Sequence, residues 1–184
     1  GVVTSPKGAA VKDIIKTVKR RFPISNIIIY PSPVQGDDAP KYLFKALDYL
    51  DSRGDMDVII IGRGGGSFED LNAFNDENLV RRIYEANTPI ISAVGHEIDN
   101  MLTDYVADLR APTPTAAGEL VTPNISELLE TFDSIEKTIN NKIKSSFKDE
   151  YVYLEYLEKE LHHYNPKDKI DSMVENLDKL EEKI

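Results

Sequence analysis

Residues 57–67, Asp-Val-Ile-Ile-Ile-Gly-Arg-Gly-Gly-Gly-Ser, decide the fold of this chain. The apolar run from Val58 to Ile61 has no polar face, which is typical of a strand buried on both sides within a parallel sheet. The glycines after it are typical of a tight turn. We therefore expect a central strand over residues 57–61, a turn over residues 62–66 and a helix that reaches residue 86.

The same alternation continues on both sides of this segment. Short β-branched runs alternate with longer amphipathic runs, which is the pattern of βα units that build a parallel sheet with helices on its faces. The expected fold class is therefore α/β, with a Rossmann-like three-layer arrangement. The other expected strands cover residues 1–4, 26–30 and 89–94, and the other expected helices cover residues 7–21, 39–52 and 97–107.

The C-terminal third of the sequence has a different pattern. Residues 110–115, Arg-Ala-Pro-Thr-Pro-Thr, are typical of a rigid extended linker whose threonines can cap the next helix. From Ile125 to Leu161, apolar residues recur about every 3.6 positions, which predicts a long helix with one apolar stripe. Asn165-Pro166 interrupts the stripe and is typical of a new helix start. We expect an α/β domain over residues 1–121 and a truncated helical coiled-coil arm over residues 122–184, whose stripe needs a partner.

Composition excludes several classes of protein. The 184 residues include no cysteine, which excludes a disulfide framework, a thiolate metal site and a cysteine nucleophile. The formal net charge of −10 argues against nucleic-acid binding through a broad basic surface. Apolar runs are too short to span a bilayer and no signal peptide is visible, so we expect a soluble cytoplasmic protein. Because the chain begins at Gly1 and ends inside a helical pattern, we expect an excerpt of a longer protein.

The glycine-rich turn over residues 62–67 is the first candidate site. Ligands of open α/β sheets bind beyond the carboxyl ends of the strands, and backbone amides that no side chain shields suit a phosphate. Arg63 adds a planar guanidinium that can bind a phosphate through two hydrogen bonds. The turn is neither a Walker loop, since no Lys follows the last glycine, nor a dinucleotide fingerprint, since Ser67 replaces its third glycine. The alternative is a tight turn with a surface arginine.

Residues 95–99, Gly-His-Glu-Ile-Asp, are the second candidate site. His96 directly follows an expected buried strand, and Asp99 is one helical turn further, where a carboxylate can orient an imidazole for general acid or base catalysis. The alternative is a histidine at a helix start with a first-turn acid. A metal site with Asp104 or Asp108 matches no recognised spacing, and a serine hydrolase that uses Ser67 lacks the G-x-S-x-G motif.

Three long motifs follow one another along the α/β part of the chain. They are Gly-Val-Val-Thr-Ser-Pro-Lys-Gly-Ala-Ala at residues 1–10 with Asp13, Ile-Ile-Gly-Arg-Gly-Gly-Gly-Ser-Phe-Glu-Asp-Leu at residues 60–71 followed by Ala-Phe-Asn-Asp-Glu at residues 73–77, and Ser-Ala-Val-Gly-His-Glu-Ile-Asp at residues 92–99 with Val-Ala-Asp-Leu-Arg-Ala-Pro-Thr-Pro-Thr-Ala-Ala at residues 106–117. Residues 1 to about 120 thereby resemble the family of exodeoxyribonuclease VII large subunits, and the tail resembles the start of that family's coiled-coil arm.

The resemblance implies a nuclease. The expected activity is hydrolysis of single-stranded DNA phosphodiester bonds from either end, with release of short oligonucleotides. The catalytic residues that the resemblance implies are Asp13, Arg63, His96 and Asp99, and the expected substrate-binding residues are Gly64, Gly65, Gly66 and Ser67. Whether Asp99 or Asp13 partners His96 stays open at this point.

The resemblance also implies partners and a cofactor requirement. No metal or other cofactor is expected to be obligatory, although assistance by Mg²⁺ stays open. The expected partners are single-stranded DNA, exonuclease VII small subunits on the helical arm, and a second copy of the chain through residues 125–184, with no membrane. We expect this chain alone to be a weak or inactive nuclease, because its net charge of −10 opposes binding of a polyanion. The alternative function is a non-catalytic phosphate-binding α/β module on a coiled-coil scaffold.

Overall fold

The computed structural model describes residues 1–66, 68–94, 100–163 and 165–182. These residues form two compact units, residues 1–128 and residues 129–184. The strands are β1 (Val2–Thr4), β2 (Ile29–Pro31), β3 (Ile59–Arg63), β4 (Ile90–Val94) and β5 (Leu109–Arg110). The helices are α1 (Ala9–Arg21), α2 (Ala39–Ser52), α3 (Phe68–Leu71), the 3-10 helix η1 (Asn72–Asn75), α4 (Glu77–Tyr84), α5 (Leu102–Val106), α6 (Pro114–Leu120), α7 (Ile125–His163) and α8 (Pro166–Glu181).

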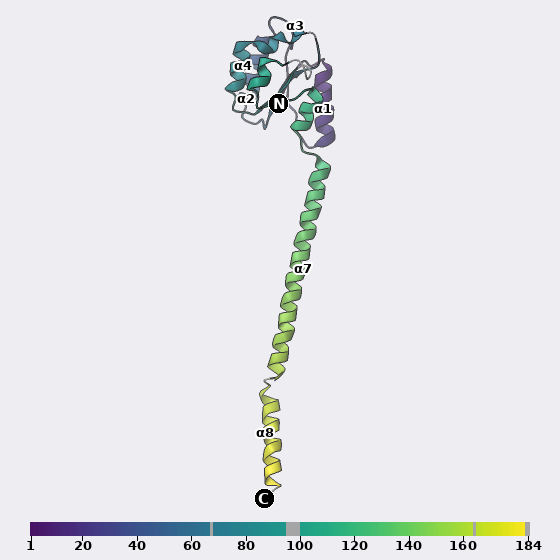
Figure 1. Ribbon diagram of the computed structural model, residues 1–184, viewed down its shortest axis with the longest axis vertical. Coiled ribbons are helices and arrows are strands. Elements are labelled where there is room, and N and C mark those ends of the chain that lie inside the picture. Colours follow the sequence, from purple (N-terminus) through teal and green to yellow (C-terminus); the bar gives the residue numbers. More distant parts are fainter. Residues whose placement is uncertain (67, 95–99, 164, 183–184) are drawn as a thin grey trace. The chain divides into compact units, whose positions relative to one another are not determined.

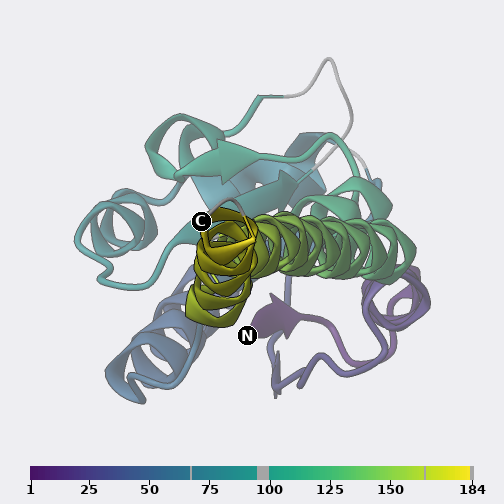
Figure 2. The same cartoon turned by 90° about the horizontal axis from the view of Figure 1, so that it is seen from below.

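The first unit is a three-layer α/β fold around a parallel sheet. The strand order is β2-β1-β3-β4-β5, and every neighbouring pair is parallel. Helix α1 lies on one face of the sheet, whereas α2 and α4 lie on the other (Figures 1 and 2). Together with the long helix α7, this arrangement confirms the predicted fold class.

Side-chain alternation along β3 divides the core between the two faces. Ile59 and Ile61 belong to the apolar cluster that includes residues of α2 and α4, and Ile60 belongs to the cluster that includes residues of α1 and α6. All three isoleucines are buried, as a central strand of a parallel sheet requires. The run Val58 to Ile61 therefore fills both cores, although Val58 itself precedes β3.

Strand β3 differs from the sequence expectation at its carboxyl end. It extends through Gly62 and Arg63, which the sequence analysis placed in a turn, and these residues pair with Ala93 and Val94 of β4. A Cβ atom at position 62 would lie only 2.6 Å from the carbonyl oxygen of Ala93. Glycine at position 62 therefore lets the two strands approach closely and prolongs the strand by two residues.

The helix expected after the glycine turn is divided into three pieces. Helices α3, η1 and α4 replace it, and Asp76 lies between the last two with extended backbone dihedral angles. The Asp76 carboxylate accepts a hydrogen bond from the backbone N–H of Leu79 at 3.1 Å, so that Asp76 is the N-cap of α4. The continuous-helix prediction was wrong because this cap stabilises a new start inside the amphipathic run.

The segment interpreted as a linker, residues 110–115, contributes to the α/β unit. Strand β5 pairs with β4, and the Thr113 hydroxyl accepts a hydrogen bond from the backbone N–H of Ala116 and caps α6. Helix α6 packs on α1, where Gly118 meets the side chain of Thr17. The linker prediction was wrong because an Arg-Ala-Pro-Thr pattern also suits a short edge strand, whereas the expected threonine cap on the next helix is confirmed.

Two other bounds differ from the expectations. Strand β2 begins at Ile29 rather than residue 26 and ends at Pro31 rather than residue 30, since the residues that pair with β1 are Ile29, Tyr30 and Pro31. Helix α5 begins at Leu102, and the first part of the expected helix over residues 97–107 lies outside the described residues. The other expected strands and helices agree with the structure to within about two residues, which is the usual uncertainty of element boundaries.

The second unit consists of helical residues 129–163 and α8. Every one of its described residues from Leu129 to His163 is exposed, including the stripe residues Phe132, Ile135, Ile139, Ile143, Phe147, Tyr151, Leu154, Leu157 and Leu161. The stripe is thus a continuous apolar face on the helix, as the sequence predicted. No described helix is both long enough and apolar enough to cross a membrane.

Candidate active site at the carboxyl edge of the sheet

The order of the strands points to the place where a ligand can bind. The chain connections change direction between β1 and β3, and in such sheets ligands bind outside the carboxyl ends of the strands at that point. The loops that leave β1 and β3 there are residues 5–8 and residues 64–67. Both predicted candidate loops follow strands at this edge, although residues 95–99, which follow β4, lie outside the described residues.

Arg63 is buried rather than exposed at this edge. Only 8% of its side chain is accessible to solvent. One guanidinium nitrogen, Nη1, donates hydrogen bonds to the carbonyl oxygens of Val34 at 3.2 Å and of Asp70 at 2.9 Å. The other, Nη2, donates to the Asp70 carboxylate at 3.0 Å and forms an ion pair with it. The guanidinium therefore holds together β3, the loop after β2 and helix α3.

The glycines after Arg63 form the accessible part of the loop. Gly65 and Gly66 are exposed and Gly64 is half-buried, so that their backbone groups lie near solvent. A Cβ atom on Gly66 would collide with Nη2 of Arg63, whereas a Cβ atom on Gly64 would meet nothing within 4 Å. Ser67, the last predicted substrate-binding residue, lies outside the described residues.

Asp13 lies on the opposite side of the sheet from the Arg63 guanidinium. It is an exposed residue of the second turn of α1, and α1 covers the face that carries Ile60. The Arg63 side chain points to the other face, where Val34 belongs to the same cluster as Ile59 and Ile61. The structure does not bring these two predicted residues into contact. They can approach a common ligand only from opposite sides of the sheet edge.

His96 and Asp99 lie outside the described residues, so that the predicted convergence of Arg63 with His96 stays a prediction. The described residues on either side of this segment are tied together by Asp104. The Asp104 side chain is only 3% exposed. Its carboxylate accepts hydrogen bonds from the Ser92 hydroxyl at 2.5 Å and from the backbone N–H of Met101 at 3.0 Å. Arg110 lies 3.4 Å from the same carboxylate. Asp104 thus connects the strand before the segment to the helix after it.

The two aspartates considered as metal ligands are tied to different residues of β4, the middle one and the first one. Asp104 accepts a hydrogen bond from Ser92, whereas Asp108 accepts one from the backbone N–H of Ile90 at 2.8 Å. Within the described ranges, no group of three or more His, Asp or Glu side chains is arranged to hold a metal ion. Both carboxylates are used by internal hydrogen bonds.

Asp51 is a buried carboxylate with a strongly altered acidity. Burial disfavours its charged form, but hydrogen bonds from the Arg82 guanidinium and from the backbone N–H groups of Thr88 and Asn87 outweigh that effect and lower its pKa to about 2. Asp51 lies in the last turn of α2 and fastens this helix to the turn before β4. This perturbed group therefore stabilises the fold far from the candidate loops.

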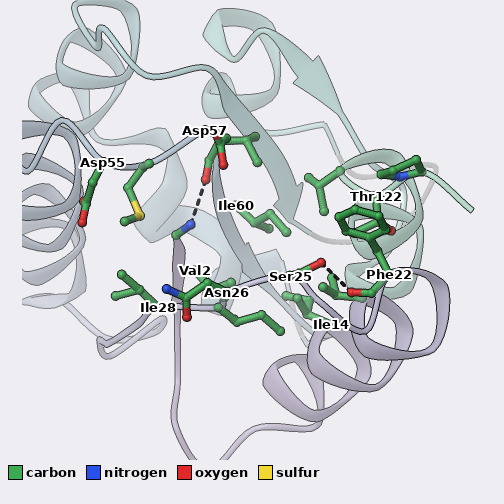
Figure 3. A pocket seen from close by; sticks show the side chains of 17 residues that line it. Val2, Ile14, Phe22, Ser25, Asn26, Ile28, Asp55, Asp57, Ile60 and Thr122 are labelled. Atoms are coloured by element: carbon green, nitrogen blue, oxygen red, sulfur yellow. Dashed lines mark hydrogen bonds between the residues drawn. The ribbon is translucent and has the colours of Figure 1, made fainter. Parts of the chain in front are cut away.

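A cavity of about 250 Å³ lies at the amino ends of the strands (Figure 3). Its wall is mainly apolar, with side chains such as Val2, Ile14 and Ile60, and Asp55 and Asp57 lie at its margin. None of the predicted site residues lines it. The cavity lies at the end of the sheet opposite to the candidate loops. Among the described residues that line it there is no histidine or arginine that could bind or protonate a phosphate.

The roles of two residues at this edge were not found from the sequence, although Asp104 was considered there as a metal ligand. Asp70 and Asp104 are ordinary acids in helical segments until their partners Arg63 and Ser92 are known. A usable signal for Asp104 was its position three residues after Met101, at the third residue of a helix, where a carboxylate can accept a hydrogen bond from the N-cap backbone. Asp70 lies three residues after Ser67, at capping-box spacing, but that pattern does not point to Arg63 as its partner.

Comparison with known proteins agrees with the resemblance. The family model described as "Exonuclease VII, large subunit" matches residues 1–184. A protein of Bacillus cereus (strain B4264) named "Exodeoxyribonuclease 7 large subunit" is 57% identical over 130 residues, which cover 71% of this chain and 29% of that protein. Proteins of the same name from Lactococcus lactis subsp. cremoris (strain MG1363) and Pseudoalteromonas translucida (strain TAC 125) are 47% identical over 184 residues and 44% identical over 180 residues. The matches cover 100% and 98% of this chain, but only 44% and 40% of those proteins.

Proposed function

Because the chain belongs to the exonuclease VII large-subunit family, we propose that it is the part of a nuclease that hydrolyses phosphodiester bonds of single-stranded DNA. The proposed products are short oligonucleotides released from either end of the strand. The observation that carries this proposal is the family match over the whole chain. The accessible glycine loop at the carboxyl edge of the sheet supports it, since exposed backbone amides suit a phosphate. We place this activity in the cytoplasm.

The proposed mechanism uses the residues that flank the edge. The amides of Gly64, Gly65 and Gly66 hold the scissile phosphate and stabilise the charge that develops in the transition state. His96 takes a proton from the attacking water or gives one to the leaving oxygen, and Asp99 or Asp13 orients its imidazole. A P–O bond to water forms as the P–O bond to the leaving nucleotide breaks, and the leaving oxygen gains a proton. Arg63 supports the glycine loop from below through its hydrogen bonds to the carbonyl oxygen and the carboxylate of Asp70.

We propose that no metal ion is obligatory for this reaction, and that Mg²⁺ has at most an assisting role. The chelator EDTA should then leave most of the cleavage intact. A loss of all cleavage that added Mg²⁺ restores would contradict this part of the proposal.

The helical unit is the proposed place for protein partners. The relatives are named as large subunits, which implies a complex with a small subunit. The exposed stripe of residues 129–161 offers an apolar face that is suited to another amphipathic helix. We propose that exonuclease VII small subunits bind this face, and that a second copy of the chain occupies it when no small subunit is present.

The test is a cleavage assay with the complete large subunit, bound to its small subunits, and DNA labelled at either end. Short labelled products should appear from single-stranded DNA for both label positions, whereas double-stranded DNA of the same sequence should remain intact. Absence of cleavage of single-stranded DNA in this complete complex would contradict the proposed function.

A further inference from the structure

The surroundings of Arg63 do not fit a residue that reaches out to its substrate. Among the described residues, its Nη atoms donate hydrogen bonds to the carbonyl oxygens of Val34 and Asp70 and to the carboxylate of Asp70. They come from two separate segments, and a side chain that leaves them would abandon an ion pair of which one partner is nine-tenths buried. Breaking such a pair is costly because it leaves a charge without its partner.

The glycine loop is built on this guanidinium. The position of a Cβ atom on Gly66 would lie 2.9 Å from Cζ of Arg63 and 3.2 Å from the Asp70 carboxylate. The backbone at Gly66 thus rests directly on the ion pair. The guanidinium therefore limits the positions that the backbone at Gly66 can take.

We infer that Asp70 is a positioning residue, which holds the Arg63 guanidinium beneath Gly66 and so fixes the backbone amides of residues 64–66 for a phosphate of the DNA. This inference rests on the proposed function, because it assumes that the loop receives a phosphodiester. The pair is electrically neutral as a whole, so the half-exposed Asp70 carboxylate does not repel an anion as an unpaired one would. Lysine could not replace Arg63, because an ammonium group cannot contact both Val34 and Asp70 with planar, bidentate geometry.

The competing role for Asp70 is that of a placeholder. In that case a DNA phosphate would displace the Asp70 carboxylate and bind Arg63 directly. The two roles predict opposite effects when the carboxylate is removed. A positioning carboxylate strengthens phosphate binding, whereas a placeholder competes with it.

The test compares three variants of the complete large subunit in complex with its small subunits. Asp70→Asn removes the charge of the carboxylate, and Asp70→Glu keeps it. The control Asp38→Asn removes a charge directly before α2, where Asp38 forms an exposed ion pair with Lys41 in the first turn of that helix. We expect Asp70→Asn to raise KM for single-stranded DNA at least about tenfold, Asp70→Glu to restore part of this loss, and Asp38→Asn to match the wild type. An unchanged KM in Asp70→Asn, or a lower one as the placeholder role requires, would overturn the inference.

A second measurement is independent of cleavage. The Kd of the complex for a single-stranded oligonucleotide is measured in the His96→Ala background, in which no cleavage is expected. Adding Asp70→Asn should weaken this binding at least about tenfold, and adding Asp38→Asn should leave it unchanged. Unchanged binding with Asp70→Asn would also overturn the inference. If the wild-type complex cleaves no DNA while Asp70→Asn still weakens binding, the proposed function fails and the positioning contact stands.

Discussion

At the scale of single residues, Asp51 offers a test of the electrostatics of the fold. Its pKa is lowered from 3.8 to about 2, and its side chain is 3% exposed. A carboxylate with a lowered pKa stabilises the folded state above its unfolded pKa, and this contribution is lost as the pH falls through the folded pKa. We expect Asp51→Asn to reduce the free energy of unfolding at pH 7 by about 2 kcal/mol.

The same variant should change how stability depends on pH. The wild type should lose stability as the pH falls from about 4 to about 2, and Asp51→Asn should lose less over that interval. Urea unfolding at several pH values measures both effects. Asp55→Asn, which breaks an exposed ion pair with Arg53, is the matched control and should behave like the wild type. Equal pH profiles for wild type and Asp51→Asn would refute the assignment.

Gly66 tests the packing of the loop on Arg63. In Gly66→Ala the new methyl group collides with the guanidinium, which must shift within its buried contacts. We expect a loss of stability of about 1–3 kcal/mol, as for other overpacked sites. Gly64→Ala places its methyl group in open space and should change stability by less than about 0.5 kcal/mol. Thermal unfolding of both variants measures the difference, and equal losses would show that Gly66 does not rest on Arg63.

The sequence predicted the candidate residues better than their surroundings. Arg63 was identified as a functional arginine by its place in a glycine turn, but its burial depends on Val34 and Asp70, which are distant or inconspicuous in the sequence. Asp13 was identified only through family resemblance, and its position on the face opposite to Arg63 follows from the topology of the sheet. Contacts between segments are what a single sequence leaves out.

At the scale of elements, Asp76 decides where α4 begins. Its carboxylate satisfies the backbone N–H of Leu79, which otherwise has no partner inside the helix. We expect Asp76→Ala to lower the free energy of unfolding by about 1 kcal/mol. Glu77→Ala removes an exposed ion pair with Arg81 from the same turn and should cost only a few tenths of a kcal/mol. Urea unfolding of the two variants compares them, and a smaller loss for Asp76→Ala than for Glu77→Ala would show that the cap is not needed.

The elements predicted well are those with strong periodicity. Helix α2 was predicted with its observed bounds, since its buried residues recur at helical spacing and Gly54 follows with a positive φ angle. The two-residue strand β5 was not predicted, because two residues have no detectable alternation. Its existence depends on pairing with β4, which is a property of the sheet rather than of the local sequence.

At the scale of the whole molecule, the helical unit should associate through its stripe. Ile139 and Ile143 are about half exposed, and an amphipathic helix with such a face gains stability by burying it. We expect the wild-type chain to sediment as a dimer or larger species at high concentration, with helicity that rises as it associates. Ile139→Glu combined with Ile143→Glu should give monomers of lower helicity. Asn141→Glu adds a charge to another face of the helix and should leave association unchanged. A wild-type monomer with full helicity at high concentration would contradict this expectation.

The proposed active site lies at the carboxyl edge of the sheet, and cleavage of single-stranded DNA by the complete complex tests this location. His96→Ala changes a residue that follows β4 at the carboxyl edge, whereas Asp57→Asn changes a residue at the margin of the cavity at the amino edge. We predict that His96→Ala abolishes cleavage, because the proposed mechanism needs His96 to take a proton from water or to give one to the leaving oxygen. Asp57→Asn should cleave like the wild type. Wild-type cleavage by His96→Ala, or loss of cleavage in a folded Asp57→Asn variant, would contradict the account.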